Sequence, residues 1–171
     1  MKNFVRMAVL TAATVAATPA LAQSASVPPG TDPVGRARII KPLQLEWVSD
    51  MNFGDLTVEG TGTAAVNAAS GAVTCTGGVI CPLSGSSAAT WKVRGTNNQT
   101  VNIVKPATVT LTHTTSPADT LTLNVVGQDT LLLSSSGMNG TDFSLGGNIA
   151  IDEATRDGTY EGSIVVTVQY P

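Results

Sequence analysis

The chain has 171 residues and a formal net charge of −3, from nine basic and twelve acidic side chains. Charged residues make up only 12% of it, about half of the ~25% typical of globular domains. The basic residues form no cluster, which argues against a nucleic-acid or anionic-membrane partner.

The first 22 residues predict a secretory signal peptide, with cleavage before Gln23. Lys2 and Arg6 give a positive start, an apolar run follows, and Ala20-Leu21-Ala22 supplies a small-residue cleavage site. The apolar run is too short for a membrane helix, and no later stretch reaches the ~18 residues that a span needs. An uncleaved anchor is the alternative. We expect an exported chain without a membrane span, in the periplasm, at the cell surface or outside the cell.

Residues 23–36 follow, with three prolines and two glycines. This composition predicts a flexible or polyproline-like leader. The remaining residues, 37–171, have the length of one ordinary domain.

Alternating apolar and polar residues predict strands along most of this domain. The first runs from Ile39 to Trp47, and Pro42 predicts that it lies at a sheet edge or carries a bulge, because proline cannot donate to a ladder. Further strands are expected at 51–58, 89–95, 100–104, 107–113, 120–126, 130–133, 142–145 and 148–151. Gly146-Gly147 is expected to form the hairpin turn between the last two.

Outside the signal peptide, no stretch shows sustained helical periodicity. The chain therefore predicts an all-β fold, an immunoglobulin-like antiparallel β-sandwich. A closed barrel is the structural alternative.

Cys75 and Cys81 are the two cysteines of the chain, and an even number in an exported protein predicts a disulfide. Gly77-Gly78 can form a tight turn, so we expect the bond to join the two strands of a small hairpin after a Gly/Thr/Ala-rich connection, 59–70. A metal site is the rival interpretation, but neither a further cysteine nor a histidine lies nearby.

The residues predict no catalytic site, cofactor or metal. His113 is the only histidine; it ends an alternating strand without a nucleophile motif beside it, and we expect it to face solvent. The acidic side chains near the last turn lack the spacing of an EF-hand loop, so solvated turn charge is expected and an adventitious calcium site is the alternative. These side chains are Asp152, Glu153, Asp157 and Glu161.

Trp47 and Trp91 both lie on the apolar face of their strands. We expect them to be core anchors, with a sugar-stacking platform as the alternative. Asn98-Gln99-Thr100 and Asn139-Gly140-Thr141 match the glycosylation pattern, which is short enough to arise by chance.

The last fourteen residues, 158–171, carry the clearest strand pattern of the chain. Apolar, aromatic or glycine residues alternate there with mostly polar ones, which places the first set on one face. That set is Tyr160, Gly162, Ile164, Val166, Val168 and Tyr170. Chain termini are usually frayed, so such a strand at this place indicates a role in folding or assembly.

Four motifs together resemble a proteobacterial family of secreted proteins that is classed as a domain of unknown function. They are Phe53-Gly54, Trp91-x-Val93-x-Gly95, Phe143-x-x-Gly146-Gly147-x-Ile149, and Gly158-x-Tyr160-x-Gly162 followed by Val166-Thr167-Val168-x-Tyr170. The resemblance covers roughly residues 37–170.

The closing motif is also similar to that of chaperone–usher pilins and spore coat protein U-like domains. Those pilins have a glycine fourteen residues from the end and an aromatic residue next to last, the places of Gly158 and Tyr170. The resemblance implies a structural or adhesive surface subunit of a fimbrium, whose residues Ile164, Val166 and Val168 are grasped by a periplasmic chaperone or a sibling subunit through strand addition.

Two features depart from the pilin pattern. The leader 23–36 alternates poorly, whereas pilins carry an alternating N-terminal extension, and pilin disulfides usually join residues that are further apart. A monomeric periplasmic or extracellular module that binds a glycan or an envelope protein is therefore the alternative. A hydrolase that depends on His113 is a third hypothesis.

Overall fold

A computed structural model describes residues 30, 33–134 and 139–171. The chain divides into two units, Met1–Arg38 and Ile39–Pro171. The expected signal peptide and most of the expected leader lie outside the described residues. Within the described ranges, no helix has the length and apolar character needed to cross a membrane.

The described residues form strands and no helix, which confirms the all-β prediction. The strands are β1 (Gln44–Ser49), β2 (Thr57–Val66), β3 (Val73–Ile80), β4 (Ala89–Arg94), β5 (Thr100–Val104), β6 (Thr108–His113), β7 (Thr120–Gly127), β8 (Thr130–Leu132), β9 (Thr141–Ile151), β10 (Tyr160–Glu161) and β11 (Thr167–Gln169).

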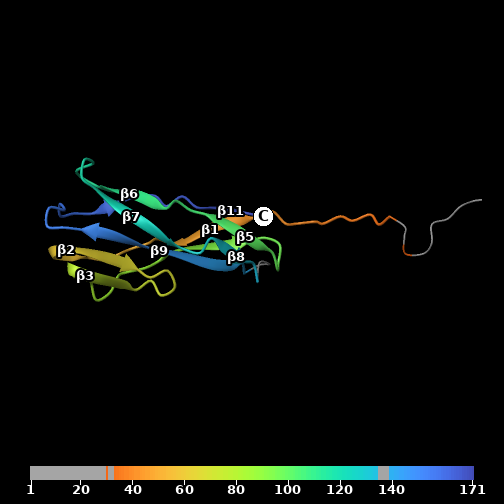
Figure 1. Cartoon of the computed structure of the whole chain (residues 1–171), viewed down its shortest axis with the longest axis horizontal. Helices are drawn as coiled ribbons and strands as arrows, with labels where there is room; N and C mark the ends of the chain where they lie inside the picture. The colour runs from red at the N-terminus through yellow and green to blue at the C-terminus, as the bar shows by residue number, and fades with distance from the viewer. Residues whose placement is uncertain (1–29, 31–32, 135–138) are drawn as a thin grey trace, which may run out of the picture. The chain divides into compact units, whose positions relative to one another are not determined.

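These strands form two antiparallel sheets (Figure 1). The larger has the order β1-β4-β9-β7-β6-β10, and β2 joins it by pairing with both β9 and β3. The smaller has the order β11-β5-β8. Because β1 is outermost in its sheet, the predicted edge position is confirmed. The strand begins at Gln44, after Pro42, and not at Ile39 as expected.

The hydrophobic core is centred on β4 and β9, where inward and outward side chains alternate as the sequence predicts. Ala89, Trp91 and Val93 of β4 are buried. The Trp91 ring stacks on Phe143 of β9, with ring centroids 5.5 Å apart and an interplanar angle of 15°. Trp91 is therefore a core anchor.

Trp47 is not a core anchor, in contrast to the prediction. It lies directly opposite Trp91 in the β1–β4 ladder, yet 62% of its surface is exposed. Trp47 is exposed because β1 is an edge strand, and a residue of an edge strand has a neighbouring strand on one side only. The indole Nε1–H donates to Asp50 Oδ1 at 3.1 Å.

Gly146-Gly147 does not form a hairpin turn, and 141–151 is one continuous strand. Neither glycine is among the described residues with positive φ. A Cβ on Gly146 would lie 2.2 Å from Val66 O, and one on Gly147 would lie 2.6 Å from Asn124 O. The two glycines thus let the flanking strands β2 and β7 approach β9 closely.

The prediction of a strand at 51–58 is also wrong. Of residues 51–56 only Asn52 pairs, in an isolated bridge to Ser87, whereas β2 begins at Thr57 and includes much of the expected connection 59–70. The β2 sequence is rich in Gly, Thr and Ala, so its strand conformation depends on pairing with β3 and β9 rather than on local pattern.

The Cys75–Cys81 disulfide is confirmed, but it does not join the two strands of a hairpin. Cys75 lies within β3 and Cys81 directly follows that strand. Their Cα atoms are 5.5 Å apart, whereas six residues of straight strand would span about 20 Å. The bond therefore clamps a sharp bend in β3, where Gly77 has a φ of 66°.

Candidate functional site: the C-terminal segment

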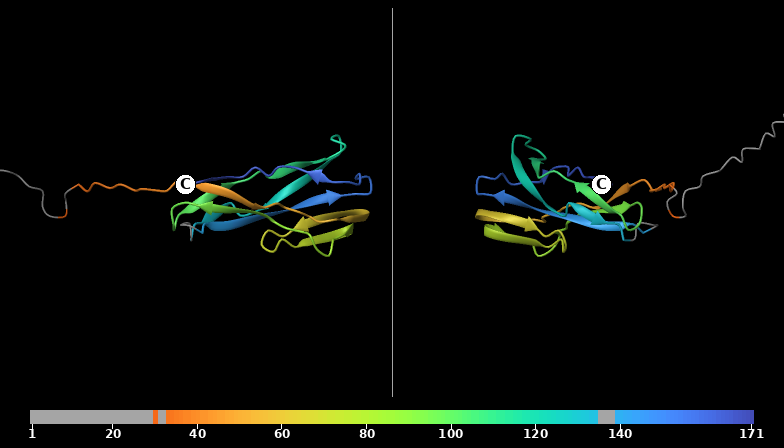
Figure 2. Two further views of the ribbon diagram at one scale, coloured as in Figure 1. Left: turned by 180° about the vertical axis from the view of Figure 1, so that it is seen from behind. Right: turned by 45° about the vertical axis from the view of Figure 1, so that its right-hand side comes forward.

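The C-terminal segment, residues 158–171, runs antiparallel along β6 and then β5 (Figure 2). In β10, Tyr160 and Glu161 pair with His113 and Thr112. In β11, residues 167–169 pair with residues 102–104 of β5. Residues 162–166 have no strand partner in the described part of the chain. The expected single strand is thus two short strands, one in each sheet.

The alternation predicted for this segment is present. Five apolar or aromatic side chains pack against the core cluster: Tyr160, Ile164, Val166, Val168 and Tyr170. The intervening residues face outward, and Val165 is 74% exposed. Even the inward side chains are only half-buried, and no residue of the segment is fully buried. The segment therefore covers the core without entering it.

Gly158 and His113 form the first anchor of the segment. Gly158 has a φ of 137°, and a Cβ there would lie 2.1 Å from His113 Nε2. Any other residue would be strained in its backbone and would collide with the imidazole ring. The close contact gives a physical reason for glycine at this position of the closing motif.

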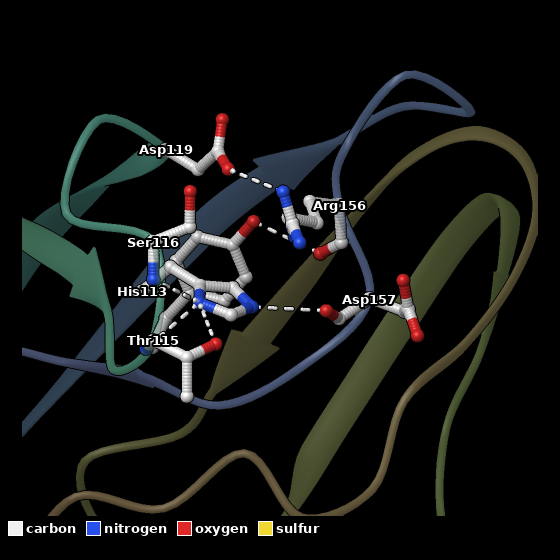
Figure 3. Close-up of polar contacts among 7 residues, drawn as sticks. His113, Thr115, Ser116, Asp119, Arg156 and Asp157 are labelled. Carbon is white, nitrogen blue, oxygen red and sulfur yellow. Dashed lines mark hydrogen bonds and ion pairs between the residues drawn. The ribbon is translucent and has the colours of Figure 1, made fainter.

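His113 is buried, with 4% of its surface exposed, so the prediction that it faces solvent is wrong. It is in phase with the inward residues Val109 and Leu111 of β6, and this phase was the signal in the sequence. Its Nε2–H donates to Asp157 O at 2.9 Å, and its Nδ1 accepts from Thr115 N and Ser116 N at 3.2 and 3.1 Å (Figure 3).

These partners assign a neutral ring with its proton on Nε2, because two N–H groups point at Nδ1. The Thr115 hydroxyl also lies 3.3 Å from Nδ1. That nitrogen already accepts from two backbone donors, so it is poorly placed to take a proton from the hydroxyl. The bonding ties the ring to the backbone on both sides.

Tyr160 extends the first anchor. Its ring meets His113 edge to face, with centroids 5.0 Å apart at 88°, and its hydroxyl donates to Arg156 O at 2.9 Å. Arg156 forms an ion pair with Asp119 at 3.6 Å (Figure 3). Burial raises the pKa of the Tyr160 phenol above 10.0, and the Asp119 charge raises it further. Sequence reasoning singled out neither Arg156 nor Asp119, because the turn before β7 and the loop after β9 meet only in the fold.

Tyr170 forms the second anchor. Its hydroxyl donates to Lys41 O at 2.9 Å and accepts from Thr96 N at 2.8 Å. A Cβ on Gly95 would lie 2.6 Å from the same hydroxyl. The penultimate residue thus joins the chain end to the approach to β1 and to the turn after β4.

An open groove of about 550 Å³ lies beside the unpaired stretch. Ser163, Val165 and Thr167 line one side of it, and residues between 104 and 110 line the other. The segment is therefore paired with β6 near its start and with β5 near its end, and the groove separates it from the β5–β6 connection between these two points.

The other candidate residues of the sequence lie elsewhere or stay apart. Asp152, Glu153, Asp157 and Glu161 are all exposed. Among the residues that the structure describes, no group of three or more His, Cys, Asp or Glu side chains is arranged to hold a metal ion.

Residues 43–170 match the model of one protein family, Domain of unknown function (DUF4402). The match bears out the resemblance to a family of unknown function. Comparisons with curated proteins and with solved structures gave no match.

Proposed function

The chain belongs to the family Domain of unknown function (DUF4402), and we propose that it is an exported, non-enzymatic surface subunit, structural or adhesive. It assembles through its C-terminal segment in a pilin-like manner. Its partners are sibling subunits and a periplasmic chaperone, both engaged by strand addition.

One observation carries this proposal: the C-terminal segment bears a half-buried apolar row and ends in an edge strand, β11. In its sheet β11 pairs with β5 alone. Ile164, Val166 and Val168 are each half-buried. An edge strand with a regular apolar face is a template for a strand of another chain.

Export and an immunoglobulin-like sandwich belong to the same proposal. A disulfide between the only two cysteines supports an oxidising compartment. Two antiparallel sheets that contribute to one hydrophobic cluster support the sandwich.

Paired aspartates on the two faces of the segment test the proposal. Val166→Asp with Val168→Asp places charges on the apolar row, and Ser163→Asp with Gln169→Asp adds the same charge on the outward face. We expect electron microscopy of the cells to show fibres for the outward pair and none for the inward pair. A milder pair, Val166→Ala with Val168→Ala, is compared with wild type. The near-UV circular dichroism of Trp91 is used to check that the two proteins are folded to the same extent. Wild-type assembly by both inward pairs would contradict the proposal.

A monomeric binding module is the second candidate, and the two anchors favour it. Gly158 and Tyr170 hold both ends of the segment to their own chain. The exposed Trp47, oriented by Asp50, offers an aromatic face on which a sugar ring can stack. This candidate predicts that the refolded mature chain stays monomeric in light scattering at all concentrations and that Trp47→Ala alone removes glycan binding.

A further inference from the structure

We propose that two copies of this chain exchange their C-terminal segments, so that β11 of each copy pairs with β5 of the other. The inference rests on the proposed function, in which this segment is the assembly element, and it names the partner as a second copy of the same chain. The acceptor is the surface of β5 and β6 that the segment covers in a single chain.

The segment is held by few interactions for its length. Two residue pairs join β10 to β6, three join β11 to β5, and 162–166 pair with no described strand. Strands β4, β5, β6, β7 and β9 each contain at least two buried residues, whereas the segment contains none. Elements with few buried contacts open at a lower free energy than the whole domain unfolds.

The groove shows where the segment begins to detach. It separates Val165, in the middle of the segment, from Pro106 in the β5–β6 connection. Backbone groups of an unpaired stretch are exposed to competition by another strand. Release of the C-terminal segment therefore breaks two short ladders and two anchors, whereas release of one continuous strand would break a single long ladder.

A segment from a second copy fits this surface because its sequence is identical. It restores the contact of Gly158 with His113, the hydrogen bond that the Tyr170 hydroxyl donates to Lys41 O, and the one that this hydroxyl accepts from Thr96 N. Exchange of an identical element conserves the contacts of the single chain, which makes it a low-cost route to a dimer.

The loop before the segment is long enough to redirect it. Residues 152–157 connect β9 to the segment, and all but Thr155 are exposed. Six extended residues reach about 20 Å. The loop carries one short turn, closed by the Asp152 carboxylate and Thr155. Its tertiary contacts are the hydrogen bond between Asp157 O and His113 and the ion pair between Arg156 and Asp119, so straightening the loop breaks these two contacts and the turn.

Cysteine pairing between two singly substituted chains tests the exchange. Thr167 and Val104 are opposed in the β11–β5 ladder, and both are exposed. Opposed residues of an antiparallel pair have the Cα separation that a disulfide accepts. The mature Thr167→Cys and Val104→Cys chains are expressed together in the periplasm, and the linked peptides are identified by non-reducing electrophoresis and mass spectrometry.

We expect a covalent heterodimer in which the thiol introduced by Thr167→Cys in one copy is bonded to the thiol introduced by Val104→Cys in the other. The matched control pairs Thr167→Cys with Val126→Cys, a site of similar exposure on β7. We expect about tenfold less heterodimer in the control, because paired strands hold two thiols at a high effective concentration. Equal yields from the two mixtures would overturn the exchange.

A locked chain separates this inference from the proposed function. Thr167→Cys and Val104→Cys in one chain form an internal bond that holds β11 on its own β5. We expect the locked chain to fold and to lose assembly, and reduction to restore it, with wild type under the same reductant as the control for Cys75–Cys81. A locked chain that assembles normally would refute the exchange, and the proposed function would still stand or fall on the paired aspartates.

Discussion

Gly158 lies directly against the imidazole of His113, so closely that a Cβ at position 158 would fall 2.1 Å from Nε2. This contact joins the start of the C-terminal segment to the end of β6. It explains two features that are independent in the sequence, a buried histidine and a glycine fourteen residues from the chain end.

Gly158→Ala is therefore expected to destabilise the domain by about 2–4 kcal/mol, from backbone strain at positive φ and from the collision with the ring. Urea unfolding measures the change. Gly85→Ala is the matched control, because Gly85 has a φ of 92° but nothing within 4 Å of a built Cβ. It should show the strain alone, and equal losses from both variants would contradict the role of His113.

The His113 ring should be the neutral tautomer with its proton on Nε2. Two backbone N–H groups point at Nδ1, and Asp157 O faces Nε2. Long-range nitrogen–proton NMR spectra of the imidazole distinguish the two tautomers directly. A protonated Nδ1 with an unprotonated Nε2 would show that the hydrogen bonds described here are wrong.

Tyr160 should lose its phenolic proton at higher pH than an exposed tyrosine, because burial raises its pKa above 10.0 and Asp119 adds to the shift. The unfolded chain deprotonates first, so the stability that this group contributes is present below pH ~10 and is lost as the pH rises through the folded-state pKa. Ultraviolet absorbance at high pH measures the titration, and Tyr160→Phe isolates the signal of Tyr170. Asp119→Asn should lower the pKa of Tyr160; an unchanged titration would argue against the Asp119 effect.

Tyr170→Phe should destabilise the domain by about 1–3 kcal/mol, since the variant loses two hydrogen bonds, the one donated to Lys41 O and the one accepted from Thr96 N. Hydrogen exchange of residues 167–169 should become faster than in wild type. Tyr160→Phe is the comparison, because it loses one hydrogen bond, to Arg156 O. If exchange in β11 is the same in wild type and Tyr170→Phe, the hydroxyl does not hold the segment.

Replacement of the two tryptophans by alanine should change the free energy of unfolding by very different amounts. Trp91→Ala deletes a buried ring stacked on Phe143 and should cost about 3–5 kcal/mol. Trp47→Ala should change stability by less than about 1 kcal/mol, because the ring is mostly exposed. Fluorescence of each single-tryptophan variant, with Phe at the other site, should place the Trp47 emission at longer wavelength. A large loss from Trp47→Ala would mean that the ring is buried against another surface.

Much of the fold can be predicted from the alternation of side chains alone. The limits of β5, the limits of β4 to within one residue, and the inward face of β4 follow from a period of two, because successive strand residues face opposite sides of a sheet. The same rule identified the inward row of the C-terminal segment. It also places His113 in phase with the inward residues of β6, although a single polar residue at a strand end predicts exposure to solvent.

The glycine pairs are where local reasoning failed. Gly146-Gly147 and Gly77-Gly78 both resemble hairpin turns in the sequence, yet the first lies in an extended central strand and the second in a bend clamped by a disulfide. A glycine serves either a turn or a close approach of backbones, and only its neighbours distinguish the two. Those neighbours, such as Val66 and Asn124, are remote in the sequence.

Composition and alternation are enough to predict that this chain is built of strands, that Cys75 and Cys81 pair, and that its last residues present an apolar face. The fold is needed to show what that face covers and how it is held. It assigned the segment to two sheets, placed His113 under Gly158 and joined Tyr170 to Lys41 across 129 positions of the chain. The physical reason is that side-chain direction is a local property of a strand, whereas burial, edge position and hydrogen-bond partners depend on residues distant in sequence.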